Sequence, residues 1–133
     1  MKAIAQARSV RISPRKVSPV GVLIQGKAVA EAKTILEFTP HRASGIIGKA
    51  LNSAVANATN NHGLKTADLR VEKVLVGHGP TLKRYRPRAR GAAYPVMKYS
   101  SHITVVLTDE KPVVKTKTEV KNQDVKTKKE EAK

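Results

Sequence analysis

Residues 29–62 space their apolar positions at the three- and four-residue intervals of amphipathic helices. From residue 41 onward this spacing predicts the longest helix of the chain, near the centre of the core; its apolar positions are Ala43, Ile47, Ala50, Leu51, Ala54, Val55 and Ala58. A shorter pattern before it predicts an amphipathic helix that stops before Pro40. Its apolar face consists of Val29, Ala32, Ile35 and Leu36.

An earlier helix is predicted over residues 14–25. Ser13 is a suitable N-cap, Pro14 suits the first helical position, and Gly26 is a suitable terminator. Pro19 lies inside this segment, where it would remove a backbone hydrogen bond and clash with the preceding turn. Two interpretations therefore remain open: the helix is kinked, or a new cap forms just before Pro19 and the helix is short.

Three segments rich in Val and Ile predict strands: "AIAQARSVRI" from Ala3, "LRVEKVLVG" from Leu69 and "SHITVVLT" from Ser101. The last two bracket residues 79–98. If these strands pair, the connection between them is about twenty residues long, far beyond the usual two to five. Connections of that length are usually functional or disordered.

Charge indicates the kind of partner, because the 133 residues carry a net charge of +16. Residues 1–108 hold 18 Lys and Arg against four acids, whereas residues 109–133 hold eight Lys against six acids. A body this basic predicts a polyanionic partner, with nucleic acid as the first candidate. The absence of Cys excludes disulfides and thiolate metal sites and fits a reducing compartment. With no signal-like or membrane-spanning apolar run, a cytosolic protein is expected.

The Lys-rich segment 109–133 has no aromatic residue, no Leu and no Ile. It lacks the apolar surface needed to offset the entropy of ordering it, so we predict a disordered tail. A short Lys-rich helix late in this segment is the alternative.

The stretch 79–98 carries six basic residues and no acidic one. Four arginines occupy alternate positions in it: Arg84, Arg86, Arg88 and Arg90. In an extended chain all four would project from one face, roughly 6.6 Å apart. Pro87 cannot donate to a strand ladder, while Gly79 and Gly91 permit turns. The stretch is therefore predicted to be an extended arm with an irregular tip.

Such an arm repels itself and cannot build a core of its own, so it should be ordered where negative charge surrounds it. Arginine suits bidentate phosphate contacts, and Tyr85, Tyr94 and Tyr99 offer stacking partners for bases. Folded RNA meets these needs together. The alternative, a solvated charged loop, usually mixes both signs of charge and favours Lys and Glu.

Five motifs, in this order and spacing, resemble one known family: "ISPRKV", "LNSAVANA", "GPTLKR", "PRARG" and "SHITVV". They are similar to the bacterial-type large-subunit ribosomal protein twenty-two of the L series, over residues 3 to about 108. The resemblance implies an α+β fold with three helices packed on a small antiparallel sheet. It also implies a long β-hairpin arm, at about residues 79–99, within a globular RNA-binding domain of residues 1–108.

For function, the resemblance implies a structural constituent of the large ribosomal subunit, located in the cytoplasm as part of the ribosome. Such a protein binds large-subunit rRNA, supports subunit assembly, and lines the nascent-peptide exit tunnel with its hairpin tip. The implied partners are rRNA, neighbouring ribosomal proteins and the nascent peptide, with no cofactor.

Site residues follow from the charge pattern and the matched motifs. The expected RNA-binding residues are Arg8, Arg11, Arg15, Lys16, Lys83, Arg84, Arg86, Arg88, Arg90 and Lys98. The expected tunnel-lining tip is Arg88, Ala89, Arg90, Gly91 and Ala92. The chain departs from the family pattern at Ala92, Pro95 and Tyr99, where basic residues are common, and Pro95 is expected to interrupt the strand ladder. With about nine residues per side, the arm would reach about 30 Å.

Two other classes of function are conceivable for so basic a chain. A free nucleic-acid-binding regulator would need a module that discriminates one site, and no helix-turn-helix or stacking-sheet pattern is present. A nucleic-acid-modifying enzyme would need a metal or acid–base set. The four histidines, His41, His62, His78 and His102, have no tight ligand spacing, so neither a metal site nor a catalytic residue is predicted.

Overall fold

The computed structural model describes residues 1–109, so the predicted tail and its helical alternative lie almost wholly outside the described residues. Within this part, the helices are α1 Pro14–Ile24, α2 Val29–Phe38 and α3 Arg42–His62, with short 3-10 turns η1 Thr66–Asp68 and η2 Ala89–Gly91. The strands are β1 Lys2–Val10, β2 Arg70–His78, β3 Leu82–Pro87, β4 Ala93–Lys98 and β5 Ser101–Thr108. All the elements predicted from apolar spacing are present.

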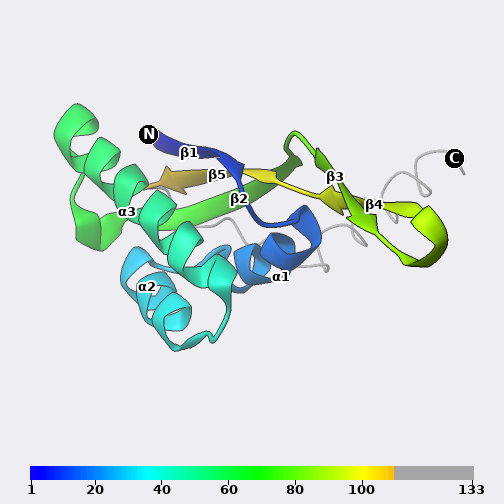
Figure 1. Cartoon of the computed structure of the whole chain (residues 1–133). Coiled ribbons are helices and arrows are strands. Elements are labelled where there is room, and N and C mark those ends of the chain that lie inside the picture. The colour runs from blue at the N-terminus through cyan, green and yellow to red at the C-terminus, as the bar shows by residue number, and fades with distance from the viewer. Residues whose placement is uncertain (110–133) are drawn as a thin grey trace, which may run out of the picture.

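A three-stranded antiparallel sheet of order β1-β5-β2 forms one layer of the body, and the helices pack against it (Figure 1). Its central strand, β5, turns Ile103, Val105 and Leu107 towards the helices, and each is fully buried. The last strand within the described residues is thus paired on both edges. The α+β fold expected from the sequence, with three helices on a small antiparallel sheet, is confirmed.

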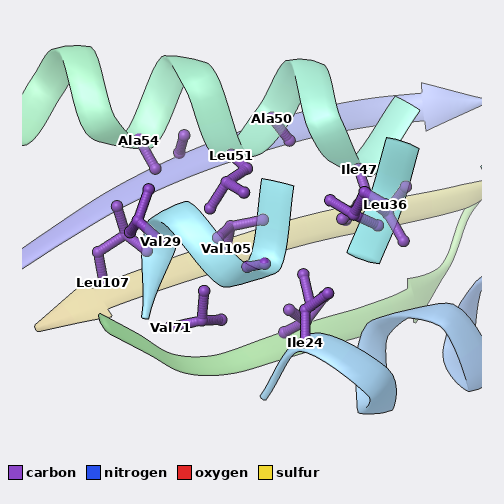
Figure 2. Close-up of a cluster of buried hydrophobic side chains, with 14 of the residues drawn as sticks. Ile24, Val29, Leu36, Ile47, Ala50, Leu51, Ala54, Val71, Val105 and Leu107 are labelled. Atoms are coloured by element: carbon purple, nitrogen blue, oxygen red, sulfur yellow. The ribbon is translucent and has the colours of Figure 1, made fainter. Parts of the chain in front are cut away.

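Helix α3 supplies more buried residues to the core than either of the other two helices (Figure 2). Six of its seven predicted apolar positions are buried, and Val55 is half-buried at the edge. Many of these residues are alanines, whose small side chains let the helix backbone approach the sheet closely. Ile47 and Leu51 fill the remaining space and are fully buried.

Helix α1 runs without interruption over Pro14–Ile24, so the interpretation of a short helix restarted near Pro19 is wrong. Pro19 lies on the exposed side of α1, where its ring meets solvent and not the core. The hydrogen bond that its missing N–H would have made to the Arg15 carbonyl is absent at the surface, where water can replace it. Gly26 follows the helix with a φ of +75°, as expected for a terminator.

Strands β2 and β5 pair antiparallel, and the segment between them forms a separate two-stranded hairpin of β3 and β4. We call residues 79–100 the arm. The arm projects beyond the body at the end of the sheet where β5 begins (Figure 1). Six residues per strand are paired, from Leu82 opposite Lys98 to Pro87 opposite Ala93. The paired part is therefore about 20 Å long, shorter than the nine residues per side expected from the sequence.

Candidate nucleic-acid interface

The arm has no core of its own. Every residue from 81 to 99 is exposed except Val96, which is half-buried. The carboxylates of the described residues are Glu31, Glu37, Asp68, Glu72 and Asp109, and none of them belongs to the arm. The positive charge of the arm is therefore not neutralised by acids along its length.

Strand register divides the arm into two unlike faces. Residues paired across an antiparallel ladder share a face, and successive pairs alternate between faces. One face carries the pairs Arg84–Val96 and Arg86–Tyr94, with Leu82–Lys98 at its base. The opposite face carries Lys83–Met97, Tyr85–Pro95 and Pro87–Ala93. Three of the four basic residues of the paired strands thus lie on one face, which we call the arginine face.

The two prolines of the ladder occupy positions at which the lack of a backbone N–H removes no hydrogen bond between the strands. The Arg88 N–H donates to the Ala92 carbonyl at 2.8 Å, which makes this pair a hydrogen-bonded one. Since bonded and non-bonded pairs alternate, the pairs of Pro87 and Pro95 are non-bonded, with their nitrogens pointing away from the partner strand. The expectation that Pro95 interrupts the ladder is wrong, because in a two-stranded ribbon each strand has one free edge that needs no donor.

At the tip, the chain leaves the extended conformation earlier than the alternating arginines suggest. Arg88 is still extended, with φ −129° and ψ 178°. Arg90 has φ 58° and ψ 32°, inside the turn η2, and Gly91 has φ +70°. The predicted single row therefore extends through Arg88 only, and placing Arg90 in it is wrong. The chain must reverse direction at this point, and two consecutive left-handed residues accomplish that.

Close backbone contacts fix the root of the arm on the body. The Gly79 N–H donates to the Ser100 carbonyl at 2.9 Å, and the Ser100 hydroxyl donates to the Pro80 carbonyl at 2.5 Å. A Cβ at position 79 would lie 2.7 Å from the Ser100 Oγ and 3.1 Å from its carbonyl carbon. Gly79 therefore serves close approach and not a turn. In addition, an Nη1–H of Arg11 donates to the Tyr99 carbonyl.

Beside this root lies a hollow of about 810 Å³, bounded by the starts of α1 and α3 and by the end of β4. We call it the root hollow. Its lining includes five cationic side chains, those of Arg11, Arg15, Lys16, Arg42 and Lys98, as well as His41. None of the residues that line it is acidic. Lys98 belongs both to the arginine face and to the root hollow, so the two basic surfaces are continuous.

Both helices that open onto the root hollow place cations at their positive ends. Arg15 and Lys16 lie in the first turn of α1, and Arg42 begins α3. Neither first turn contains an acid, and neither Ser13 nor His41 makes a side-chain cap hydrogen bond. A cation at a helix N-terminus opposes the macrodipole by about 0.3–1 kcal/mol. This arrangement is unfavourable in the isolated chain and becomes favourable when an anion binds.

The structure gathers nine of the ten predicted RNA-binding residues onto these surfaces. Arg11, Arg15, Lys16 and Lys98 line the root hollow, and the remaining five belong to the arm. Arg8 lies apart on β1, exposed, with its Nε donating to Gln6 Oε1 at 2.9 Å. Two residues that line the root hollow, Arg42 and His41, were not among the RNA-binding residues predicted from the sequence. The signal that could have found Arg42 is a basic residue in a first helical turn that lacks an acid.

The histidines have different surroundings, and among residues 1–109 no group of three or more His or acidic side chains could hold a metal ion. His102 Nδ1 accepts a hydrogen bond of 3.0 Å from the Ser9 N–H. Ser9 has a φ of 52° and lies in the irregularity between Ala7 and Val10, where β1 slips against β5. His102 thus stabilises an irregular strand edge.

Comparison with families of known proteins matches residues 5–108 to the one described as ribosomal protein L22p/L17e. The matched range includes nearly all of the sheet, all three helices and the whole arm. No helix in the described part of the chain combines the length and the apolar character needed to span a membrane.

Proposed function

The chain belongs to the ribosomal protein L22p/L17e family, structural rRNA-binding proteins of the large ribosomal subunit, and on this premise we propose that its arm penetrates folded rRNA and lines the nascent-peptide exit tunnel with its tip. The body remains outside the RNA and anchors the arm through the root. The protein acts by binding and by shape, without turnover.

The observation that carries this proposal is the exposure of the arm, from residue 81 to residue 99, together with its unbalanced positive charge. An isolated two-stranded hairpin is marginally stable in water at best. RNA on both sides of the arm would supply the missing contacts and would neutralise its charge. The arginine face suits phosphates, whereas the opposite face offers Tyr85 beside Pro95 for contact with bases and sugars.

The residues of the tip are suited to line the wall of a narrow passage. Ala89, Gly91 and Ala92 are small, and the turn that they form with Arg90 is fully exposed. Small residues at the surface of a narrow passage leave room for an extended peptide. Arg88 and Arg90 can hold this turn against phosphates on either side.

A role in assembly follows from the two basic surfaces. The arginine face and the root hollow present their charges to RNA from different parts of the molecule, and the root fixes one relative to the other. A protein of this form would hold separate rRNA segments together while the subunit folds.

Charge reversal at the tip tests the assembly role. We expect the double variant Arg88→Glu, Arg90→Glu to fold as an isolated protein, since neither residue packs on the body, but to enter large subunits poorly. Sucrose-gradient sedimentation of cell lysates at moderate and high salt measures this. The charge-matched control is Lys33→Glu, Lys65→Glu, at exposed sites away from the arm. Normal incorporation of the tip variant, or an equal defect in the control, would contradict the proposal.

The tunnel role needs a separate readout. A photo-crosslinking amino acid at Ala89 should react with a stalled nascent chain in intact ribosomes, whereas the same group at the exposed Ala56 of α3 should not. A nascent chain that reacts at neither site would remove the tunnel role while leaving rRNA binding intact.

The two competing functions predict different results in the same gradients. A free regulator would leave the ribosomal fractions at moderate salt and would bind one nucleic-acid site tightly by itself. An enzyme would turn over an RNA or DNA substrate. Salt-resistant co-migration with the large subunit speaks against both.

A further inference from the structure

We propose that the root hollow seats a single unstacked nucleotide of the bound RNA, with its base inside the hollow and its phosphates on the cationic rim. This inference rests on the proposed function, because it assumes that RNA reaches this surface. It adds a defined binding site and a recognised feature, a bulged or single-stranded nucleotide, to a general affinity for rRNA.

The interior of the root hollow is mostly apolar. Ile12, Val20 and Ala43 line it and are nearly completely buried, so they form its floor. Met97 and Tyr99 also line it and keep 40% and 51% of their surface exposed, so they form its accessible wall on the side of the arm. An aromatic and apolar surface of this kind suits the face of a base and does not suit a phosphate.

The rim of the root hollow is cationic on every element that builds it. Arg11 precedes α1, Arg15 and Lys16 belong to its first turn, Arg42 begins α3 and Lys98 ends β4. Within residues 1–109, none of these five side chains forms an ion pair with a carboxylate. Arg11 uses one N–H for the Tyr99 carbonyl and keeps other donors for a ligand. Phosphates on both sides of a nucleotide would meet these charges.

Shape separates this ligand from other forms of RNA. A duplex presents stacked bases behind a convex backbone, so it can touch the rim but cannot fill the hollow. The hollow of about 810 Å³ lies within the size range of small-molecule sites and can hold one nucleotide. RNA-binding proteins commonly recognise unstacked bases by stacking them on aromatic side chains and arginines.

The position of the site gives it a consequence for the arm. A nucleotide between α1, α3 and Tyr99 would contact the body and the arm at once, next to the bond from Arg11 to the Tyr99 carbonyl. Its binding would therefore stabilise one direction of the arm relative to the body.

The full-length protein and two short RNA hairpins test the proposal. One hairpin contains a single bulged 2-aminopurine, and the other is fully paired with the same number of phosphates. We expect the bulged RNA to bind about tenfold more tightly, with 2-aminopurine fluorescence quenched as the base stacks. Tyr99→Ser and Arg42→Gln, both at exposed positions, should abolish this preference. The control Arg84→Gln, Arg86→Gln should weaken both RNAs equally and keep the preference.

Each failure has its own meaning. Equal affinity for the two hairpins, or a preference that survives Tyr99→Ser, would overturn the inference. If the same protein still enters large subunits, the proposed function stands without it. A protein partner is the third possible outcome. If an acidic aromatic peptide competed with RNA for the hollow, and Arg42→Gln abolished the binding of this peptide, the hollow would be assigned to a protein partner and the proposal would be overturned. Within assembled subunits, a photo-crosslinker at Tyr99 should react with an unpaired rRNA nucleotide; reaction with a paired segment would contradict it.

Discussion

Arg42 shows most clearly, at the scale of single residues, that a local cost can indicate a binding role. It lies at the positive end of α3 with no acid in the first turn. We expect Arg42→Glu to raise the free energy of unfolding of the isolated protein by about 0.6–2 kcal/mol, because an unfavourable cation is removed and a favourable anion takes its place at the positive end of the macrodipole. The same substitution should weaken RNA binding. Denaturant unfolding and an RNA titration measure the two effects.

Lys49→Glu is the matched control for Arg42→Glu, because it makes the same change of charge on an exposed position of the same helix, away from its ends. It should leave stability nearly unchanged. A destabilised Arg42→Glu would show that the Arg42 side chain supports the fold and that its position at the helix start has no connection with anion binding.

At Gly79 the root leaves no room for a Cβ atom. In Gly79→Ala the new Cβ would meet Ser100 Oγ at 2.7 Å and backbone atoms of residues 100 and 101 at 3.1–3.2 Å. Backbone cannot move aside cheaply, so we expect the free energy of unfolding to fall by about 1–3 kcal/mol. Gly77→Ala, two residues earlier, would meet only His102 Cβ at 3.8 Å and should be tolerated. Thermal unfolding of both variants decides the matter, and equal melting temperatures would refute the steric account.

Residue-level prediction from the sequence gave the shared face of the alternating arginines and failed for the backbone geometry of the tip. The alternation of Arg84, Arg86 and Arg88 gave their shared face correctly, since a strand has a period of two. Arg90 breaks the pattern because the reversal of the chain needs left-handed residues, and an arginine gives no sign that it will adopt φ 58°.

We expect the arm and the body to be separable elements. His78 pairs with Ser101 and Gly79 bonds to Ser100, so β2 and β5 already meet at the root. Replacing residues 80–99 by Asn-Gly would close a two-residue hairpin there. We expect this armless variant to unfold cooperatively, with a stability within about 1 kcal/mol of the full chain, and to be absent from large subunits. Circular dichroism and gradient sedimentation test both parts. A variant that fails to fold would show that the arm packs on its own body.

Glu72 links two strands across the sheet and makes stability depend on pH. Lys2 Nζ on β1 donates to Glu72 Oε1 on β2 at 2.8 Å, and Lys73 Nζ lies 3.9 Å from the same oxygen. The hydrogen bond from Lys2, helped by both positive charges, lowers the pKa of Glu72 below its ordinary value of 4.5. The contribution to stability is therefore present above pH 4.5 and disappears as pH falls through the lowered pKa.

The prediction is that acid destabilises the wild-type protein more than Glu72→Gln. The effect should be small and should shrink in high salt, because the groups are partly exposed. Urea unfolding from neutral pH down to about pH 3 measures it. Asp109 has a lowered pKa for a similar reason, its bond to the N-terminal amine, and stays in both proteins as a common background. Identical pH profiles would mean that the Lys2 bond contributes nothing in solution.

At the level of elements, periodicity predicted the helices and strands because the residues buried on one face of an element recur in the sequence at the period of that element. The prolines were misjudged because their effect depends on surroundings. Pro19 is tolerated on an exposed helix side, and Pro95 is tolerated at a non-bonded ladder position. The root hollow could not be predicted at all, since it joins residues 11–20, 41–43 and 97–99, which no local pattern connects.

Over the described part of the molecule, cations occur throughout, whereas the acids lie away from the arm. The described acids lie on α2, on η1, at the start of β2 and just after β5, whereas the arm and the root hollow hold cations and no acid. Because β2 runs towards the arm and β5 runs back from it, the start of β2 and the end of β5 are at the end of the sheet away from the arm (Figure 1). A molecule with this polarity would approach a polyanion with its arm first.

Salt dependence tests whether both basic surfaces meet phosphates. Each bound phosphate releases counterions, so the slope of log K against log salt becomes shallower by about 0.7–0.9 for each phosphate that a variant no longer binds. Replacing Arg84, Arg86 and Arg88 by Gln should make the slope shallower by about 2–3, and so should replacing Arg15, Lys16 and Arg42. Replacing Lys33, Lys49 and Lys65, which are exposed elsewhere on the body, should leave it nearly unchanged. Filter binding of large-subunit rRNA over a salt series provides the slopes. If all three triple variants changed the slope equally, binding would depend on net charge alone; if only the arm variant changed it, the root hollow would bind no phosphate and its nucleotide site would be refuted as well.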